Sequence, residues 1–89
     1  MPSRLNIRIT GEVQGVFFRQ SAKSEAKRLS LSGFTRNEPD GSVYIEAEGD
    51  EPALKEFLEW CHQGPRGARV NGVGMQEAGA TGYKNFEIK

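Results

Sequence analysis

The sequence predicts an α+β fold, in which helices pack on one face of an antiparallel sheet. Several short segments alternate apolar with polar residues, which is the period of a strand with one buried face. Two longer segments place apolar residues three and four apart, which is the period of an amphipathic helix. These segments follow the order strand, helix, strand, strand, helix, strand, so both helices are predicted to connect strands of one sheet.

The first strand and the first helix are predicted from two clear periods. Residues 5–9 alternate strictly between apolar and polar side chains, which predicts a strand. After a loop, residues 18–29 place apolar side chains on one helical face, which predicts a helix of about three turns. Gly33 is expected where this helix ends, because glycine is common just after a helix C-terminus.

A β-hairpin is predicted next. A short strand candidate at 34–37 runs into the turn sequence EPDG, in which proline presets φ and glycine tolerates positive φ. The alternation resumes over residues 43–48, which predicts the second strand of the hairpin. Glu46 and Glu48 fall on the face of that strand that is predicted to meet solvent.

The second helix has both a start and a stop signal. Asp50 is an N-cap candidate, apolar residues follow at helical spacing over 54–61, and Gly64-Pro65 ends the helix. A further strand is predicted over 69–77. The alternation of Phe86 with Ile88 suggests one more short strand.

This order of elements predicts the split βαβ or ferredoxin-like arrangement, an antiparallel sheet of four to five strands with two helices on one face. The strands at 5–9 and 34–37 then run parallel, with the strand at 43–48 between them. Their carboxyl ends share one edge, so the loops that follow them emerge about 10 Å apart, which is two strand spacings. Arg19 and Asn37 are therefore expected to face one small ligand.

Length and composition exclude several classes of function. A chain of 89 residues suits a single domain spanning 1–89, and 12 basic against 12 acidic residues leave no excess charge to attract nucleic acid or an anionic membrane. One cysteine, Cys61, and one histidine, His62, cannot build a disulfide framework or a zinc site of the usual kind. No apolar run of ~18 residues is present, so neither secretion nor membrane spanning is expected. We expect a cytoplasmic monomer without metal or cofactor.

The loop before the first helix has the composition of an anion site. A glycine-containing loop at a strand-to-helix junction aims successive backbone N–H groups outward, and the helix N-terminus adds partial positive charge. Arg19 would supply a planar, permanently charged fork that matches two phosphate oxygens. The residues predicted to bind phosphate are Gln14, Gly15, Val16, Phe17, Phe18 and Arg19.

The residue types missing from these loops narrow the chemistry. His62 is predicted far away on the second helix, and neither loop offers a Ser/His or Cys/His pair, so covalent catalysis is not supported. Phosphoryl transfer from an acyl phosphate needs little acid-base help, because the leaving group is a stable carboxylate. Asn37 carries a neutral carboxamide that could hold a water in line with phosphorus.

Two stretches of the sequence resemble the signatures of the acylphosphatases, and the resemblance extends along nearly the whole chain. The stretches are GEVQGVFFR at 11–19 and GFTRNEPDGSV at 33–43. The resemblance implies a five-stranded ferredoxin-like fold and metal-independent hydrolysis of acyl phosphates to a carboxylate and inorganic phosphate. It places the phosphate-binding arginine at Arg19 and the water-orienting asparagine at Asn37. Thr35 departs from the family pattern, which usually has a small apolar residue there.

Two alternatives remain at this stage. The same site without turnover would make the chain a phosphate or carbamoyl-phosphate binding module, or a former accessory domain of a larger carbamoyl-transfer enzyme. The same element order also serves RNA-recognition domains, but Tyr44 is the only aromatic on the predicted central strands, which disfavours base stacking. Phe18 is expected in the core, whereas Phe17 either packs or lines a pocket for the acyl group.

Overall fold

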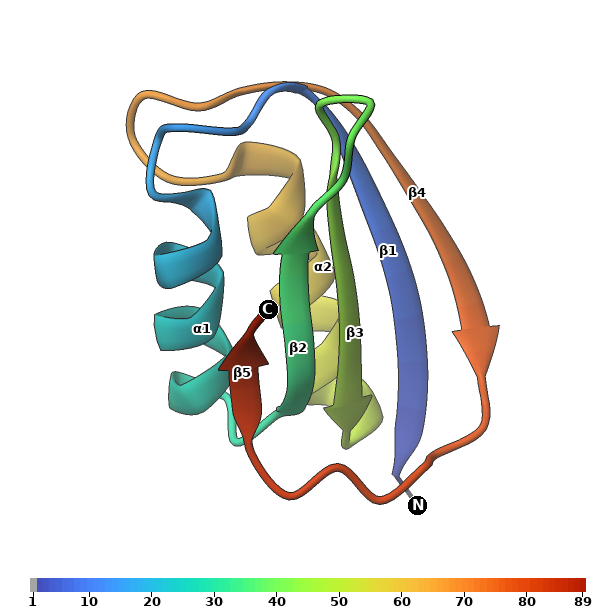
Figure 1. Cartoon of the computed structure of the whole chain (residues 1–89). Helices are drawn as coiled ribbons and strands as arrows, with labels where there is room; N and C mark the ends of the chain where they lie inside the picture. Colours follow the sequence, from blue (N-terminus) through green and yellow to red (C-terminus); the bar gives the residue numbers. More distant parts are fainter. Residues whose placement is uncertain (1) are drawn as a thin grey trace.

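The structure is a computed structural model that describes residues 2–89, and it has two layers (Figure 1). A five-stranded sheet forms one layer, and two helices on one of its faces form the other. Along the chain the elements are β1 (Ser3–Glu12), α1 (Phe18–Arg28), β2 (Ser32–Asn37), β3 (Val43–Gly49), α2 (Glu51–Gln63), β4 (Arg69–Ala78) and β5 (Phe86–Ile88). The predicted fold class and the predicted order of elements are confirmed.

The strand order is β4-β1-β3-β2-β5, so β3 lies between β1 and β2 as predicted. The first four strands pair antiparallel, whereas β5 pairs in parallel with β2. The sheet is therefore mixed, and the expectation of a wholly antiparallel sheet was wrong. The reason is visible in Figure 1, where the chain crosses from β4 along one end of the sheet and enters β5 beside the start of β2.

The core fills the space between the sheet and the helices. Alternate residues of the two central strands are fully buried there, as their period requires. They are Ile7 and Ile9 of β1 with Val43, Ile45 and Ala47 of β3. The helices contribute Ala22 and Ala26 of α1 and Phe57 and Cys61 of α2. Burial raises the pKa of the Cys61 thiol, so this cysteine packs as a small apolar side chain.

One expectation about helix ends requires correction, and the other is confirmed in position. Helix α1 ends at Arg28, and Gly33 is a residue of β2. Gly33 has φ 142°, and a Cβ there would clash with the backbone carbonyl of Glu46, so this position needs glycine for close strand contact. Asp50 does occupy the N-cap position of α2, but its side chain makes no capping hydrogen bond.

Glu48 is buried, although its strand face was predicted to meet solvent. The connection between β4 and β5 folds over this part of the sheet. Glu48 accepts hydrogen bonds from the backbone N–H groups of Thr81, Gly82 and Tyr83. Sequence periodicity assigned the face correctly, but it carried no information about the loop that covers the face.

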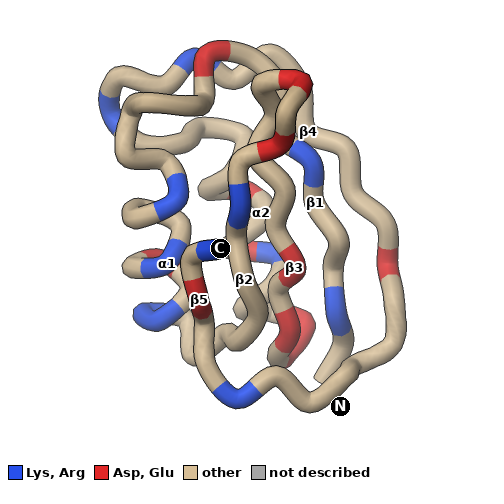
Figure 2. The backbone as a smooth tube through the Cα atoms, viewed as in Figure 1, with Lys and Arg blue, Asp and Glu red and all other residues tan. Residues whose placement is uncertain are grey.

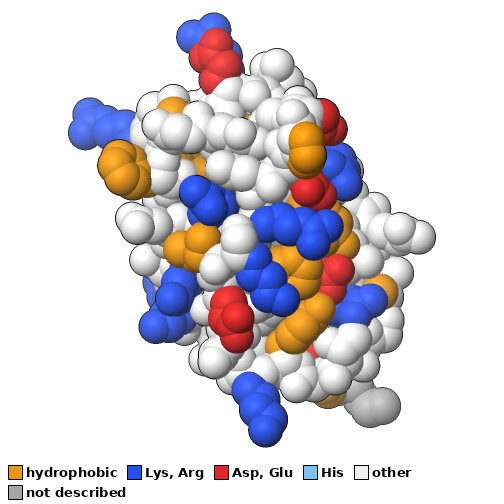
Figure 3. All heavy atoms as spheres, viewed as in Figure 1, with side chains coloured by type: hydrophobic (Ala, Val, Ile, Leu, Met, Phe, Trp, Pro, Cys, Tyr) orange, Lys and Arg blue, Asp and Glu red, His pale blue; other side chains and the backbone are white. Residues whose placement is uncertain are grey.

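The remaining outer face of the sheet carries basic side chains over aromatic rings. Arg36 lies 4.9 Å from the centroid of the Tyr44 ring, and Lys89 lies 4.6 Å from that of Phe34. Figure 3 shows Lys and Arg side chains gathered beside hydrophobic ones near the middle of this face. Arg36 and Arg8 also pair with Glu38, at 3.3 and 3.6 Å, and so hold the turn between β2 and β3.

Candidate active site

Three connections meet at one end of the sheet: the β1–α1 loop, the β2–β3 turn and the α2–β4 connection (Figure 1). A cavity of about 300 Å³ lies at this end. The residues that line it come from the β1–α1 loop, the first turn of α1, the end of β2 and β5. They are Val13, Gly15, Phe17, Phe18, Arg19, Gln20, Asn37 and Ile88. Residues from three separate segments of the sequence therefore face one space.

The β1–α1 loop turns through two residues in the left-handed region. Gly15 has φ 74° and Phe17 has φ 61°. A Cβ at Gly15 would meet nothing within 4 Å, so it is the backbone conformation and not lack of space that favours glycine there. Phe17 occupies the N-cap position of α1, and because it is not glycine, its left-handed backbone conformation is strained.

The N-terminus of α1 carries amide groups without helical partners. Its first hydrogen bond runs from the N–H of Ser21 to the carbonyl of Phe17 at 3.0 Å, so the N–H groups of Phe18 to Gln20 precede it. No side chain caps this helix, and its first turn has no acidic residue. The partial positive charge of this helix end is therefore not neutralised by the helix itself, which suits an anion.

Arg19 adds a full positive charge in this first turn. It is half-buried and lines the cavity. Within residues 2–89 its guanidinium makes no ion pair, whereas Arg8, Arg28 and Arg36 each have carboxylate partners. The cavity lining contains one cation and no carboxylate. The site is thus electrostatically prepared for an anion that the chain does not supply.

Asn37 is the last residue of β2 and pairs with Val43 of β3. It lies two residues from Thr35, which opposes the core residue Ile45, so both side chains leave the sheet on the helix side. This places the Asn37 carboxamide in the cavity lining, with Arg19. The predicted convergence of the two residues on one space follows from the strand order. Their chemical roles remain predictions.

The structure brings together Gly15, Phe17, Phe18, Arg19 and Asn37, but not Gln14 and Val16. Val16 is half-buried and packs against the core. The Gln14 side chain turns away from the cavity toward the β2–β3 turn. These two residues belong to the loop without lining the cavity.

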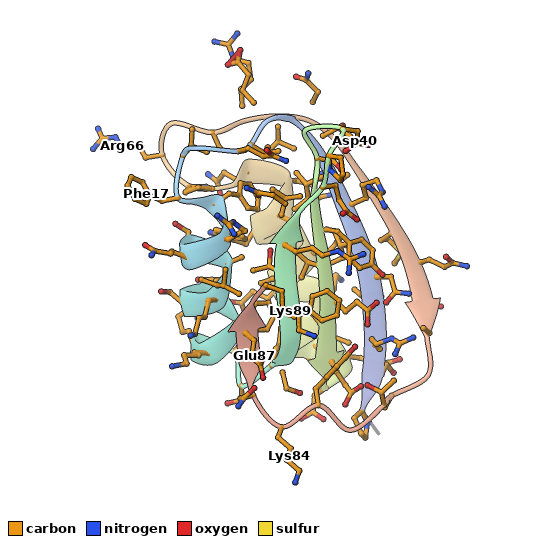
Figure 4. The ribbon with its side chains drawn as sticks, in the orientation of Figure 1. Phe17, Asp40, Arg66, Lys84, Glu87 and Lys89 are labelled. Atoms are coloured by element: carbon orange, nitrogen blue, oxygen red, sulfur yellow. The ribbon has the colours of Figure 1, made fainter. Side chains whose placement is uncertain are left out.

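Phe17 and Phe18 have opposite environments. Phe18 is 2% exposed, and its ring packs 5.3 Å from that of Trp60, so its predicted core position is confirmed. Gly64 lies close beneath, where a Cβ would come within 2.8 Å of the Phe18 ring. Phe17 is 75% exposed, and Figure 4 shows it pointing outward from the loop at the rim of the site.

Val13, Gln20 and Ile88 also line the cavity, and sequence reasoning missed them. Gln20 directly follows Arg19 in the first turn of α1, and this position could have predicted that Gln20 lines the cavity. Ile88 reaches the cavity because β5 pairs with β2, and the N–H of Lys89 donates to the carbonyl of Thr35 at 2.8 Å. The sequence did not indicate beside which strand the last strand would lie.

Thr35, the departure from the family pattern, is fully buried on the same face of β2. Its Oγ1 has no hydrogen-bond partner within residues 2–89. The hydroxyl is therefore a buried polar group one strand repeat from Asn37. It does not enter the cavity lining.

Among the described residues, no group of three or more His, Cys, Asp and Glu side chains is arranged to hold a metal ion. In the same part of the chain, neither helix has the length and apolar character needed to cross a bilayer.

Together the fold and the site define a small α+β protein with a cavity at a helix N-terminus that is lined by one arginine and one neutral carboxamide, a charge distribution that suits an anion. Comparison with known proteins then identifies the family. The acylphosphatase family model matches residues 5–88. The chain belongs to the acylphosphatase family.

Individual relatives agree with this assignment. An acylphosphatase of Rubrobacter xylanophilus is 46% identical over 87 residues, which are 97% of this chain and 79% of that protein. The crystal structure of acylphosphatase from Bacillus subtilis matches with a TM-score of 0.96 at 36% identity, covering 100% of this chain and 99% of that one. The structure of an acylphosphatase from Coxiella burnetii matches with a TM-score of 0.96 at 32% identity, covering 99% and 93%. The function predicted from the sequence, an acylphosphatase hydrolase, is confirmed.

Proposed function

We propose that Arg19 and the first-turn amides of α1 hold the phosphoryl group of an acyl phosphate while Asn37 orients the attacking water. The observation that carries this proposal is that Arg19, which has no carboxylate partner in residues 2–89, shares one cavity with Asn37. The guanidinium donates hydrogen bonds to two phosphoryl oxygens. The N–H groups at the start of the helix donate to the remaining phosphoryl oxygen.

The reaction is a displacement at phosphorus. The water oxygen forms a bond to phosphorus while the bond from phosphorus to the acyl oxygen breaks, and that oxygen leaves in a carboxylate. The proton of the attacking water passes to the phosphate product. Because the transition state of such transfers is loose, charge stabilisation and positioning supply most of the catalysis.

Asn37 suits the water because its side chain is neutral. Its Oδ1 accepts a hydrogen bond from the water and so directs the water oxygen toward phosphorus. A carboxylate at this position would repel the anionic substrate. The cavity lining of the described residues offers no histidine, cysteine or carboxylate as a base, so orientation of the water is the role that the site supports.

The first experiment measures hydrolysis of benzoyl phosphate with the purified protein in excess chelator, with inorganic phosphate as a competitor. Turnover with competitive inhibition by phosphate is the expected result. Phosphate binding without turnover would indicate the non-catalytic binding module, and carbamoyl phosphate in the same assay tests the second ligand of that alternative. A requirement for added metal would overturn metal-independent hydrolysis.

We also propose that the chain works in the cytoplasm as a single-domain monomer. Its one cysteine is a free, buried thiol, which suits a reducing compartment. Among residues 2–89 the exposed large hydrophobic residues are Phe17 and Ile88, both in the cavity lining, and Met75 on β4, so they do not form one interface. Sedimentation velocity tests the monomer, and fractionation of the source cells tests the location.

A further inference from the structure

The side chain of Gln14 joins the two halves of the site. Its Nε2 donates to the carbonyl oxygen of Glu38 at 2.8 Å and to that of Ser42 at 2.9 Å. Gln14 directly precedes Gly15 of the anion-binding loop, and Glu38 directly follows Asn37. The two hydrogen bonds therefore connect the segment that would bind phosphate with the segment that would place the water.

The two acceptor carbonyls belong to a turn that is itself held firmly. The N–H of Glu38 donates to the carbonyl of Ser42 at 2.8 Å, which closes the turn. The carboxylate of Asp40 accepts from the N–H of Ser42 at 2.9 Å and from its hydroxyl at 2.6 Å. Figure 2 shows acidic residues on this turn beside basic ones on β1 and β2, which agrees with the ion pairs of Glu38.

Within the described residues, no other hydrogen bond joins the loop at 13–17 to the turn at 38–42. Their other connections run through the sheet, from β1 across β3 to β2, and through Arg8 of β1, which donates to the hydroxyl of Ser42 and pairs with Glu38. These contacts hold the turn to the strand and not to the loop that follows the strand. A misplacement of about 1 Å in an active site can cost about a hundredfold in rate, so a direct tether between the halves has functional weight.

We propose that Gln14 is a positioning residue that holds Asn37 at the correct place relative to the phosphate-binding loop. This inference rests on the proposed roles of Arg19 and Asn37. Glutamine suits the position because its amide nitrogen carries two hydrogens for two carbonyl oxygens. Glutamate of the same length would direct a charge at two acceptors, and methionine would fill the same space without donating.

The test compares kinetic constants of Gln14→Met with those of the unchanged protein. We expect kcat to fall about tenfold or more, because Asn37 loses its fixed position. We expect the inhibition constant of inorganic phosphate to stay within about twofold, because Arg19 and the first-turn amides remain. A large rise of that constant would assign Gln14 to phosphate binding and overturn the proposal, as would an unchanged kcat.

A matched control separates positioning from loss of stability. Leu58 of α2 is half-buried, does not line the cavity, and shares a separate surface pocket with Ser3 and Leu5 of β1. Leu58→Ala should lower the free energy of unfolding without lowering kcat, when each variant is assayed well below its melting temperature. If kcat falls in Leu58→Ala as it does in Gln14→Met, the effect at Gln14 is loss of stability and the proposal is wrong.

A double-mutant cycle decides whether Gln14 acts through Asn37. In an Asn37→Ala background, Gln14→Met should lower kcat by less than about twofold, because there is no carboxamide left to place. If the decrease in kcat of the double variant equals the product of the decreases in the two single variants, the proposal is wrong. If Asn37→Ala alone keeps full activity, the proposed function of Asn37 fails; if only Gln14→Met keeps it, the inference about Gln14 fails by itself.

Discussion

At the end of the sheet where β3 finishes, successive backbone N–H groups point at a carboxylate of the protein itself. Glu48 is surrounded by the N–H groups of residues 81–83, and it also accepts from the hydroxyl of Thr81. Helix α2 begins at this same end, with Asp50 at its N-cap and Glu51 in its first turn. At this end the amides of residues 81–83 have a carboxylate partner from the chain, and the start of α2 has acidic residues beside it.

At the opposite end the same kind of donor is left open. The first-turn amides of α1 have no capping side chain and no acidic neighbour in their turn. Arg19 adds a charge that no carboxylate in residues 2–89 neutralises. Backbone amides thus hold a carboxylate of the chain at one end of the sheet, and at the other end they stay open for the substrate that we propose.

The largest expected effect comes from removing the open charge. Arg19→Ala should lower kcat/KM about 10³-fold or more and weaken phosphate inhibition, because the residue contacts the phosphoryl group in both substrate and transition state. Steady-state hydrolysis of benzoyl phosphate and inhibition by phosphate measure both. Arg28→Gln on the same helix is the control, since Arg28 pairs with Glu25 and Glu56 away from the cavity. Comparable losses in the two variants would contradict the assigned role.

Removal of the neutral carboxamide should have a smaller and more selective effect. Asn37→Ala is expected to lower kcat about 10²-fold while leaving the inhibition constant of phosphate nearly unchanged, because the side chain acts on the water and not on the bound anion. The same assay separates the two constants. Weak phosphate binding in this variant would show that Asn37 is a binding residue instead.

Substitution of Glu48, at the end of the sheet where the amides already hold a carboxylate, should lower stability and not the rate of hydrolysis. Glu48→Gln removes the charge that strengthens its hydrogen bonds with the backbone, so the free energy of unfolding should fall by about 1–3 kcal/mol. Urea unfolding measures this loss, and kcat should stay close to that of the unchanged protein. Glu77→Gln, an exposed position on β4, controls for the change in net charge. A drop in kcat well beyond that of the control would mean that the two ends are not independent.

The smallest effect is expected from acid. Burial alone would raise the pKa of Glu48, but the hydrogen bonds from the loop lower it below its ordinary value of 4.5. A folded-state pKa below the unfolded value gives stability that is present above 4.5 and is lost as the pH falls through the folded pKa. Urea unfolding from about pH 6 to about pH 3 should show less acid destabilisation in Glu48→Gln than in the unchanged protein. Parallel curves for the two proteins would contradict this.

Much of the fold could be predicted because its signals are local. The alternation in β1 and β3 and the helical spacing in α1 and α2 each come from residues close together in the chain. The strand order then followed from the rules for crossover connections, and it placed Arg19 and Asn37 at one edge. What failed were the features without a local period, above all the glycine-rich connection at 79–85 and the direction of β5.

The candidate site divides in the same way. The neighbouring sequence is enough to predict the functional side chains of Arg19 and Asn37 and the backbone conformation of the loop glycine. Ile88 and the partners of Glu48 could not be found, because each depends on contact between segments more than 30 residues apart. Gln14 was recognised as part of the loop, but the direction of its side chain depends on the β2–β3 turn.

The sequence by itself determined which residues can bind an anion and orient water, because residue type and short-range period decide charge, donors and local backbone shape. Only the tertiary structure decided which backbone N–H donors stay unpaired and which are hydrogen-bonded to an acceptor of the chain itself. Amides at both ends of the sheet are chemically alike, and their difference arises from what the folded chain brings within hydrogen-bonding distance. Glu48 reaches one set, whereas the other faces a cavity whose lining has no carboxylate.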